Sequence, residues 1–236
     1  MTSKEKVIEI VSKHEKNLDG INYLIYCNEN TNPKKMLISF SSMGSTNYSR
    51  ISWFCEQPRL EDYVFLFIYD KDNQFYQGSQ NFEIFKKIIF RSMSSYDIKK
   101  ENVYTVGNSM GGTAAIYYAT LLGLNGAIAA NPQFNIRLSA IHTSPSWVQC
   151  MKKSKEFKSI EDILDNVTFL PKIFIEYSSY LPDFYAAQEY IKIWSTYGAF
   201  IIAQHNRIIE HATDAPNKNK IISTINYLES VMLPTY

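Results

Sequence analysis

Residues 103–112 read Val-Tyr-Thr-Val-Gly-Asn-Ser-Met-Gly-Gly, and the run TAAIYYATLL follows them directly. The apolar start predicts a buried strand and the later run predicts a helix, so a G-x-S-x-G motif lies in the turn between them. A turn this sharp strains the backbone of its serine, and it requires small residues two positions before and two positions after it. Gly107 and Gly111 meet that requirement. The turn is therefore expected to project the hydroxyl of Ser109 above the strand ends.

A phosphate-binding turn is the alternative interpretation of these glycines. A P-loop ends in Gly-Lys-Ser or Gly-Lys-Thr, and a dinucleotide-binding turn reads G-x-G-x-x-G with an acidic residue roughly 20 positions later. Neither pattern is present here. The motif is therefore interpreted as a nucleophile elbow, the turn that presents a reactive serine.

Outward from this motif, short apolar runs alternate with helical stretches, which is typical of buried parallel strands joined by crossover helices. The expected strands are residues 21–27, 36–41, 63–69, 103–106, 126–129, 172–177 and 199–203. The expected helices are residues 81–95, 110–122, 182–197 and 217–232, and an N-terminal helix whose apolar face carries Val7, Ile8, Ile10 and Val11. The pattern predicts an α/β fold, a three-layer α/β/α sandwich with a mostly parallel central sheet.

The length of 236 residues suits one domain, residues 1–236, better than two. Only residues 138–170, a polar stretch rich in serine and lysine, depart from the regular alternation. They are expected to form either a small lid over a site or an ordinary surface excursion.

Composition excludes several classes of partner. Lys plus Arg number 24 against 23 Asp plus Glu, and a net charge of +1 gives no electrostatic footprint for nucleic acid or an anionic membrane. Cys27, Cys55 and Cys150 lack CxxC spacing, so neither a disulfide framework nor a metal site is expected. Charges interrupt every apolar run in residues 1–17, which argues against a signal peptide or a membrane span. The expected location is the cytoplasm.

A serine that transfers acyl groups needs a base, an acid that orients the base, and donors for the oxyanion. His14 precedes the sheet on a charged helix, and His142 lies in the polar excursion. His205 and His211 both follow the last expected strand. His211, in a loop just before the final helix, is the preferred base, and His205 is the alternative.

The acid is expected between the serine and the histidine in chain order. Asp183 follows the strand at 172–177 and lies in a loop that begins a helix, where aspartate is also common as an N-cap. Glu176 is the competitor, but strand residues point into packed layers more often than toward a site. Asp183 is therefore the predicted acid.

Two backbone N–H groups are expected to stabilise the oxyanion. The first belongs to Met110, at the N-terminus of the helix after the elbow. The second is expected from the loop of small residues after the strand at 36–41, from either Ser42 or Met43.

Substrate contacts are expected from the loop at 69–78, which follows a strand and so opens at the carboxyl edge of the sheet. Asp70, Asp72 and Tyr76 are the candidates there, with packing and loop-forming roles as the alternative. Asn108, beside the elbow serine, is the fourth candidate.

With the elbow Gly107-Asn108-Ser109-Met110-Gly111 followed by Asp183 and His211, the chain resembles the α/β-hydrolase superfamily from residue 36 through the final helix. Its IYD…FYQG stretch and the segment Ala-Asn-Pro-Gln at 130–133 resemble small bacterial enzymes that acetylate capsule or glycoprotein glycans. That narrower resemblance implies acetyl-CoA as donor and a sugar hydroxyl as acceptor. The chain departs from lipases and many esterases because no HGG motif precedes Ser42.

These residues lead to the hypothesis of an enzyme that forms an acyl-Ser109 intermediate. It would act as an esterase-type hydrolase or as an O-acetyltransferase on a small polar molecule or glycan, with no required cofactor. A catalytically inactive protein that keeps the fold as a binding or scaffold module is the competing hypothesis.

Overall fold

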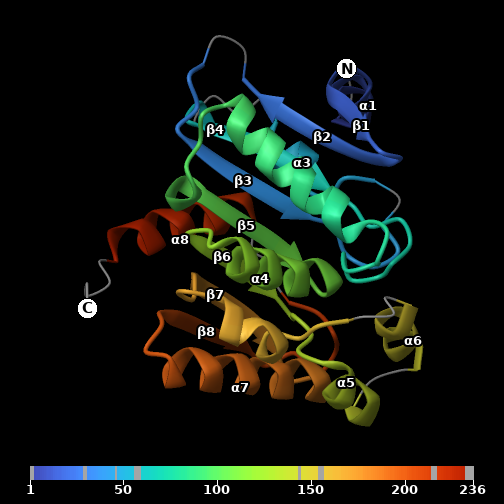
Figure 1. Ribbon diagram of the computed structural model, residues 1–236, viewed down its shortest axis with the longest axis vertical. Helices are drawn as coiled ribbons and strands as arrows, with labels where there is room; N and C mark the ends of the chain where they lie inside the picture. The colour runs from blue at the N-terminus through green and yellow to red at the C-terminus, as the bar shows by residue number, and fades with distance from the viewer. Residues whose placement is uncertain are drawn as a thin grey trace.

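The computed structural model describes residues 3–28, 31–45, 47–55, 60–142, 145–153, 157–213 and 217–231. Within these ranges, eight strands form one sheet in the order β1-β2-β4-β3-β5-β6-β7-β8 (Figure 1). The pairs β1/β2 and β2/β4 are antiparallel, and all other neighbouring pairs are parallel. The strands are β1 Glu15–Leu18, β2 Ile21–Cys27, β3 Lys35–Phe40, β4 Tyr63–Ile68, β5 Val103–Asn108, β6 Gly126–Ala130, β7 Lys172–Ser178 and β8 Ile201–Asn206.

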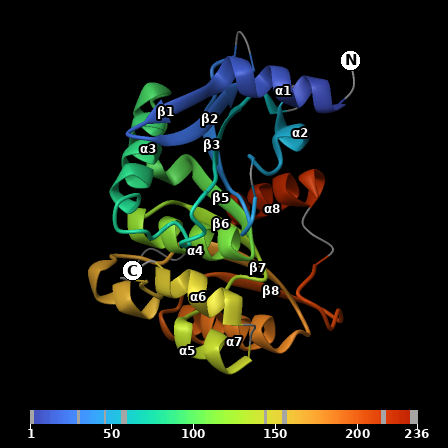
Figure 2. The ribbon, with the colours of Figure 1, turned by 90° about the vertical axis from the view of Figure 1, so that its right-hand side faces the viewer.

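Helices cover both faces of this sheet (Figure 2). One face carries α3 (Phe82–Ser95), α4 (Met110–Leu122) and α7 (Leu181–Thr196); the other carries α1 (Ser3–His14), α2 (Ile51–Phe54) and α8 (Lys218–Ser230). Side chains alternate across each strand, so in β3 Met36 and Ile38 enter the core under the first face and Leu37 enters the second. The three-layer α/β/α sandwich is as predicted.

The helix after the elbow lies deepest in the fold. α4 is buried on nearly every side, between the strands β3, β5 and β6 and the neighbouring helices. A helix without a polar face is stable in such a place, which explains its alanines and its two buried tyrosines. The observed bounds of α4 coincide with the predicted residues 110–122.

The predicted strands and helices are present, and their observed ends differ from the predicted ends by no more than three residues. The predicted end of the last helix, Met232, lies outside the described residues. In α1, Ile10 is buried and Val7 and Val11 pack against the core, but Ile8 is 61% exposed, so its assignment to the apolar face is wrong.

One strand was not predicted. β1 is polar and exposed along its first three residues, so it has no alternating apolar pattern. Two residues separate it from its partner β2, and these form a turn at Asp19-Gly20 with φ angles of 50° and 87°. Positive φ at both central residues is typical of the tight turns that join antiparallel strands, and Asp-Gly is a favoured sequence there.

The described residues of the polar excursion at 138–170 include three short helical segments. α5 (Ile136–His142) enters it, α6 (Pro145–Lys153) follows, and a 3-10 helix spans Glu161–Asn166. Residues 143–144 and 154–156 of the excursion lie outside the described part. Met151 and Ile163 are buried in the core on the α4 side of the sheet, which anchors the excursion there. In the described ranges, no helix combines the length and apolar character needed to cross a membrane.

Candidate active site

The turn between β5 and α4 has the strained geometry expected of a nucleophile elbow. Ser109 lies at φ 52° and ψ −124°, a combination that a residue with a side chain rarely adopts. A Cβ atom on Gly107 would collide with the carbonyl oxygen of Gly111, and one on Gly111 would collide with that of Phe40. The colliding atoms belong to the backbone, so they cannot move aside as the end of a flexible side chain could. Both positions therefore require glycine.

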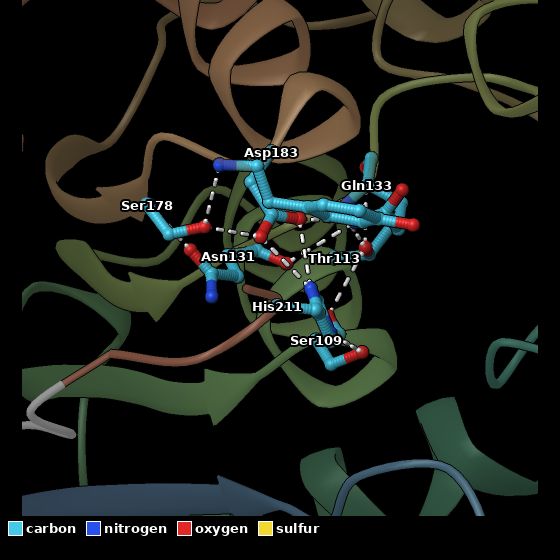
Figure 3. Close-up of polar contacts among 8 residues, drawn as sticks. Ser109, Thr113, Asn131, Gln133, Ser178, Asp183 and His211 are labelled. Carbon is cyan, nitrogen blue, oxygen red and sulfur yellow. Dashed lines mark hydrogen bonds and ion pairs between the residues drawn. The ribbon is translucent and has the colours of Figure 1, made fainter. Parts of the chain in front are cut away.

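The structure brings the predicted base and acid to this serine (Figure 3). His211 Nε2 lies 2.9 Å from Ser109 Oγ, within the expected range of about 2.6–3.2 Å. On the other side of the ring, His211 Nδ1 lies 2.8 Å and 2.9 Å from the two carboxylate oxygens of Asp183. A carboxylate can only accept, so Nδ1 carries a proton, and the Nε2 of a neutral ring is left as the acceptor for the serine hydroxyl.

Asp183 lies in the first turn of α7 and is completely buried. Its carboxylate does not cap the helix. In addition to its contact with His211, the carboxylate accepts hydrogen bonds from Ser178 Oγ at 2.7 Å and from Gln133 Nε2 at 3.1 Å. Gln133 follows β6 and Ser178 ends β7, so three neighbouring segments at the carboxyl edge of the sheet meet at this carboxylate.

The competing acid faces away from the site. Glu176 is also completely buried, but its carboxylate binds Lys220 Nζ of α8 and Asn206 Nδ2. α8 covers the opposite face of the sheet from α7. The side chain of Glu176 therefore points to the face opposite Asp183, where it forms an ion pair with Lys220.

The competing histidine also lies elsewhere. His205, in β8, is exposed; its Nε2 is 2.9 Å from Ser179 Oγ, and its ring stacks on Tyr177. His14 contacts the ring of Tyr26 at the far edge of the sheet. The side chain of His142 lies outside the described part of the structure.

A cavity of about 450 Å³ opens at Ser109. Its lining consists of Ser42, Met43, Asn108, Ser109, Ala130, Asn131, Trp147, His211, Ala212 and Thr213. No lysine, arginine, aspartate or glutamate lines it among the described residues. The cavity therefore offers hydroxyl, amide and apolar surfaces to a neutral group.

Of the predicted oxyanion donors, Ser42 and Met43 line the cavity, whereas Met110 is buried directly after Ser109 and is not among the described lining residues. Met110 is the first residue of α4, where backbone N–H groups have no partner within the helix and carry partial positive charge. Ser42 and Met43 both line the cavity, and Ser42 Oγ donates to the carbonyl oxygen of Asn108 at 3.1 Å. Either of these two residues can supply the second donor.

Asn108 lines the cavity as expected of a substrate contact, but one end of its amide is occupied. Its Oδ1 accepts a hydrogen bond of 2.7 Å from Arg50 Nη2. Arg50 is buried, which lowers the pKa of its guanidinium to about 10, and its Nη1 donates to Ser39 Oγ and to the carbonyl oxygen of Phe40. The amide nitrogen of Asn108 has no partner among the described contacts, so it can donate to a substrate.

Asp70 was a candidate substrate contact with a loop-forming role as the alternative, and the structure corrects the candidate assignment in favour of that alternative. Its buried carboxylate accepts backbone N–H groups of Asp72, Gln74 and Tyr76 at 3.2, 2.6 and 2.9 Å. Burial raises the pKa of Asp70, although these N–H groups act in the opposite direction. The residue therefore organises its own loop instead of facing the cavity.

Tyr76 and Asp72 are corrected in the same way. Tyr76 is fully buried, and its hydroxyl donates to the carbonyl oxygen of Ser41 at 2.8 Å. Asp72 accepts a hydrogen bond from Asn81 Nδ2 at the surface. Neither they nor Asp70 are among the described residues that line the cavity.

We predict that Asp70→Ala destabilises the protein. The substitution leaves three backbone N–H groups of the loop without their acceptor, and the N–H of Tyr76 is buried, where an unsatisfied donor costs about 1–3 kcal/mol. Urea denaturation should show a lower midpoint with little change in slope. An unchanged midpoint would mean that the carboxylate does not hold the loop.

Sequence reasoning missed Trp147 in α6. The centroid of its indole ring lies 4.3 Å from that of the His211 imidazole, with 65° between the ring planes, and it lines the cavity. Tyr180 lies 6.1 Å from the same imidazole. No local signal marks a tryptophan of the excursion as a neighbour of the base, because the contact depends on how α6 packs.

Comparison with known proteins supports the fold assignment. No protein-family model matches the sequence, and neither does any curated protein sequence. The capsule O-acetyltransferase of Neisseria meningitidis serogroup A is similar in structure, at 15% identity over 90% of this chain and 94% of that chain, with a TM-score of 0.68.

Two proteins of Staphylococcus aureus are similar at 13% identity, each over 91% of this chain and 96% of its own. They are the S-formylglutathione hydrolase FrmB, with a TM-score of 0.66, and the fluorophosphonate-binding serine hydrolase FphF, with a TM-score of 0.65. All three have the α/β-hydrolase fold. The present chain therefore has the α/β-hydrolase fold, as the elbow motif led us to expect.

Proposed function

We propose that this α/β-hydrolase-fold chain is a serine acyl-transfer enzyme in which Ser109 is the nucleophile, His211 the base and Asp183 the orienting acid. One observation carries the proposal. His211 Nδ1 faces a buried carboxylate while Nε2 faces the hydroxyl of a strained elbow serine. That arrangement fixes the tautomer that accepts the serine proton.

Acylation follows from this geometry. Ser109 Oγ attacks the carbonyl carbon of an ester or thioester while its proton passes to His211 Nε2. The N–H of Met110, with that of Ser42 or Met43, stabilises the tetrahedral oxyanion. When the intermediate collapses, the bond to the leaving group breaks, and the leaving oxygen or sulfur takes the proton from His211.

Deacylation uses the same residues in reverse. A water molecule or an alcohol attacks the acyl-Ser109 carbonyl, and His211 Nε2 takes its proton and returns it to Ser109 Oγ as the serine leaves. Water gives hydrolysis, whereas a substrate hydroxyl gives O-acyl transfer. The uncharged cavity lining supports a neutral acyl group and a neutral polar acceptor such as a glycan hydroxyl. The likeness to a capsule O-acetyltransferase supports acetyl-CoA as a candidate donor.

The experiment that tests this proposal is a search for the acyl-enzyme. The protein is incubated with p-nitrophenyl acetate or with acetyl-CoA, the reaction is quenched in acid, and the mass of the intact protein is measured by mass spectrometry. We expect one acetyl group per chain, located on Ser109 by peptide mapping. The acetyl group should be lost when unquenched protein is transferred to buffer without donor, or when a sugar acceptor is added. Failure of both donors to acetylate Ser109 would favour a catalytically inactive binding protein.

The proposed role of Asp183 predicts that Asp183→Asn lowers kcat by about 10⁴-fold, because an amide does not hold the imidazole in the required tautomer. Glu176→Gln is the control, since it neutralises another buried carboxylate near the end of β7 without touching His211. Steady-state hydrolysis of p-nitrophenyl acetate measures both variants. A severe loss of kcat in folded Glu176→Gln with little loss in Asp183→Asn would overturn the assignment of the acid.

A further inference from the structure

The carboxylate of Asp183 is held from two sides by neutral donors that belong to different segments. Gln133 Nε2 donates to Oδ1 at 3.1 Å, and Ser178 Oγ donates to Oδ2 at 2.7 Å (Figure 3). All three side chains are at most 2% exposed. Since His211 Nδ1 is nearly equidistant from both oxygens, the orientation of the carboxylate plane decides where the imidazole points.

Gln133 is itself fixed to the helix that begins at the elbow. Its backbone N–H donates to Thr113 Oγ1 of α4 at 2.7 Å, and its carbonyl oxygen accepts from Tyr190 Oη of α7 at 2.9 Å. Thr113 is one turn after Ser109, and its backbone N–H donates to the carbonyl oxygen of that serine. Gln133 therefore connects the acid to the helix that carries the proposed nucleophile.

Ser178 is fixed just as closely from the other side. Its backbone N–H donates to Asn131 Oδ1 at 2.9 Å. Asn131 has a φ of 45°, and its own N–H donates to the carbonyl oxygen of Glu176. This backbone conformation is uncommon for a residue with a side chain, although asparagine tolerates it better than most. The ends of β6 and β7 are thereby locked together beneath Asp183.

We propose that Gln133 and Ser178 are positioning residues: they act through Asp183 to aim His211 at Ser109. The proposal rests on the proposed acyl-transfer function and adds two residues to it. Buried donors whose own backbones are hydrogen-bonded give a carboxylate one orientation, and displacement of a catalytic group by about 1 Å can cost on the order of 10²-fold in rate. A purely structural role would instead lower stability and leave the rate of the folded protein unchanged.

The test compares Gln133→Met with Gln77→Met. Gln77 is a matched control because it is also buried and its amide makes two hydrogen bonds to the backbone of Lys158, and neither residue is among those that line the cavity at Ser109. With p-nitrophenyl acetate, Gln133→Met is expected to lower kcat by on the order of 10²-fold with KM little changed. Gln77→Met should retain the kcat of wild type. Equal kcat values for the two variants would overturn the proposal.

A double-mutant cycle separates positioning from general damage. If Gln133 acts through Asp183, Gln133→Met should cost little further rate in an Asp183→Asn background, because the group it positions is already lost. An effect of the same size in both backgrounds would mean that Gln133 does not act through the acid. Ser178→Ala, which removes only one hydroxyl, provides an independent second test if Gln133→Met folds poorly.

A proton NMR measurement gives a readout that does not need turnover. The Nδ1–H of His211, hydrogen-bonded to a carboxylate, should give a downfield resonance that is absent from His211→Gln. We expect it to shift or broaden in Gln133→Met and Ser178→Ala and to stay in place in Gln77→Met. An unmoved resonance in both of the first two variants contradicts the positioning role. A wild type that is never acylated on Ser109 contradicts only the proposed function.

Discussion

Ser109→Ala is expected to lower kcat for p-nitrophenyl acetate by about 10⁶-fold, the loss seen when a comparable triad loses its serine. The reason is chemical, because no acyl-enzyme can form without the hydroxyl. The hydrogen bond from the Thr113 N–H to the backbone carbonyl of residue 109 does not depend on the side chain. The fold should therefore survive, and circular dichroism and the urea midpoint should match wild type.

Retention of near-normal turnover by a folded Ser109→Ala would remove this residue as the nucleophile. A residual rate above that of the uncatalysed reaction is compatible with its role. An enzyme whose triad lacks the serine still accelerates the reaction by about 10³–10⁴-fold, through the oxyanion donors and substrate binding. The measurement therefore needs a no-enzyme control and purification that excludes wild-type protein.

His211→Gln is expected to have the second large effect, also about 10⁶-fold, because removal of the base costs about as much as removal of the serine. Glutamine leaves the proton of Ser109 Oγ without an acceptor of suitable basicity, and it leaves the Asp183 carboxylate without its third donor. Both kcat and kcat/KM should fall together.

His205→Gln is the matched control, because it makes the same substitution at the other histidine that follows β7. His205 is exposed and contacts Ser179 and Tyr177, with no hydrogen bond to Ser109 or Asp183 among the described contacts. Its turnover should stay close to wild type. A large loss in His205→Gln together with a small loss in His211→Gln would reverse the assignment of the base.

The parts of the site that sequence reasoning located are those fixed by local backbone geometry. A strained turn at Ser109 needs small residues on both sides, and the collisions of a Cβ at Gly107 or Gly111 show how strictly the fold imposes this. The order of serine, acid and histidine along alternating strands and helices then directs attention to Asp183 and His211. Asp183 lies in the first turn of α7 and His211 in the loop after β8, both at the carboxyl edge of the sheet, where such folds place their sites.

The residues that sequence reasoning missed or misplaced depend on packing between segments. Asp70 looks like a ligand-binding carboxylate because it follows a strand, yet it turns inward to satisfy its own loop. Trp147 of α6 contacts His211 and lines the cavity through packing between segments that are distant in sequence. By contrast, the hairpin that creates β1 was marked by Asp19-Gly20 and was recoverable from the turn chemistry alone.

Gln133 and Ser178 fall between these two cases. Each lies where a strand ends, so its approach to the carboxyl edge of the sheet could be expected. Which of the polar residues there binds Asp183 depends on the direction of each side chain. In β7, the side chain of Ser178 points toward α7 and that of Glu176 points toward α8. A strict two-residue alternation would have predicted both side chains on the same face of the sheet. The strand ends at Ser178, whose backbone N–H donates to Asn131 Oδ1.

The most direct test of the central claim is labelling with a fluorophosphonate probe, which reacts with serines that a neighbouring base has activated. We expect one covalent adduct per chain, mapped to Ser109 by tandem mass spectrometry, absent from Ser109→Ala and strongly slowed in His211→Gln. His205→Gln should be labelled at the rate of wild type. Absence of labelling in the folded wild-type protein, or an adduct on any other residue, would contradict the account of Ser109 as a nucleophile activated by His211.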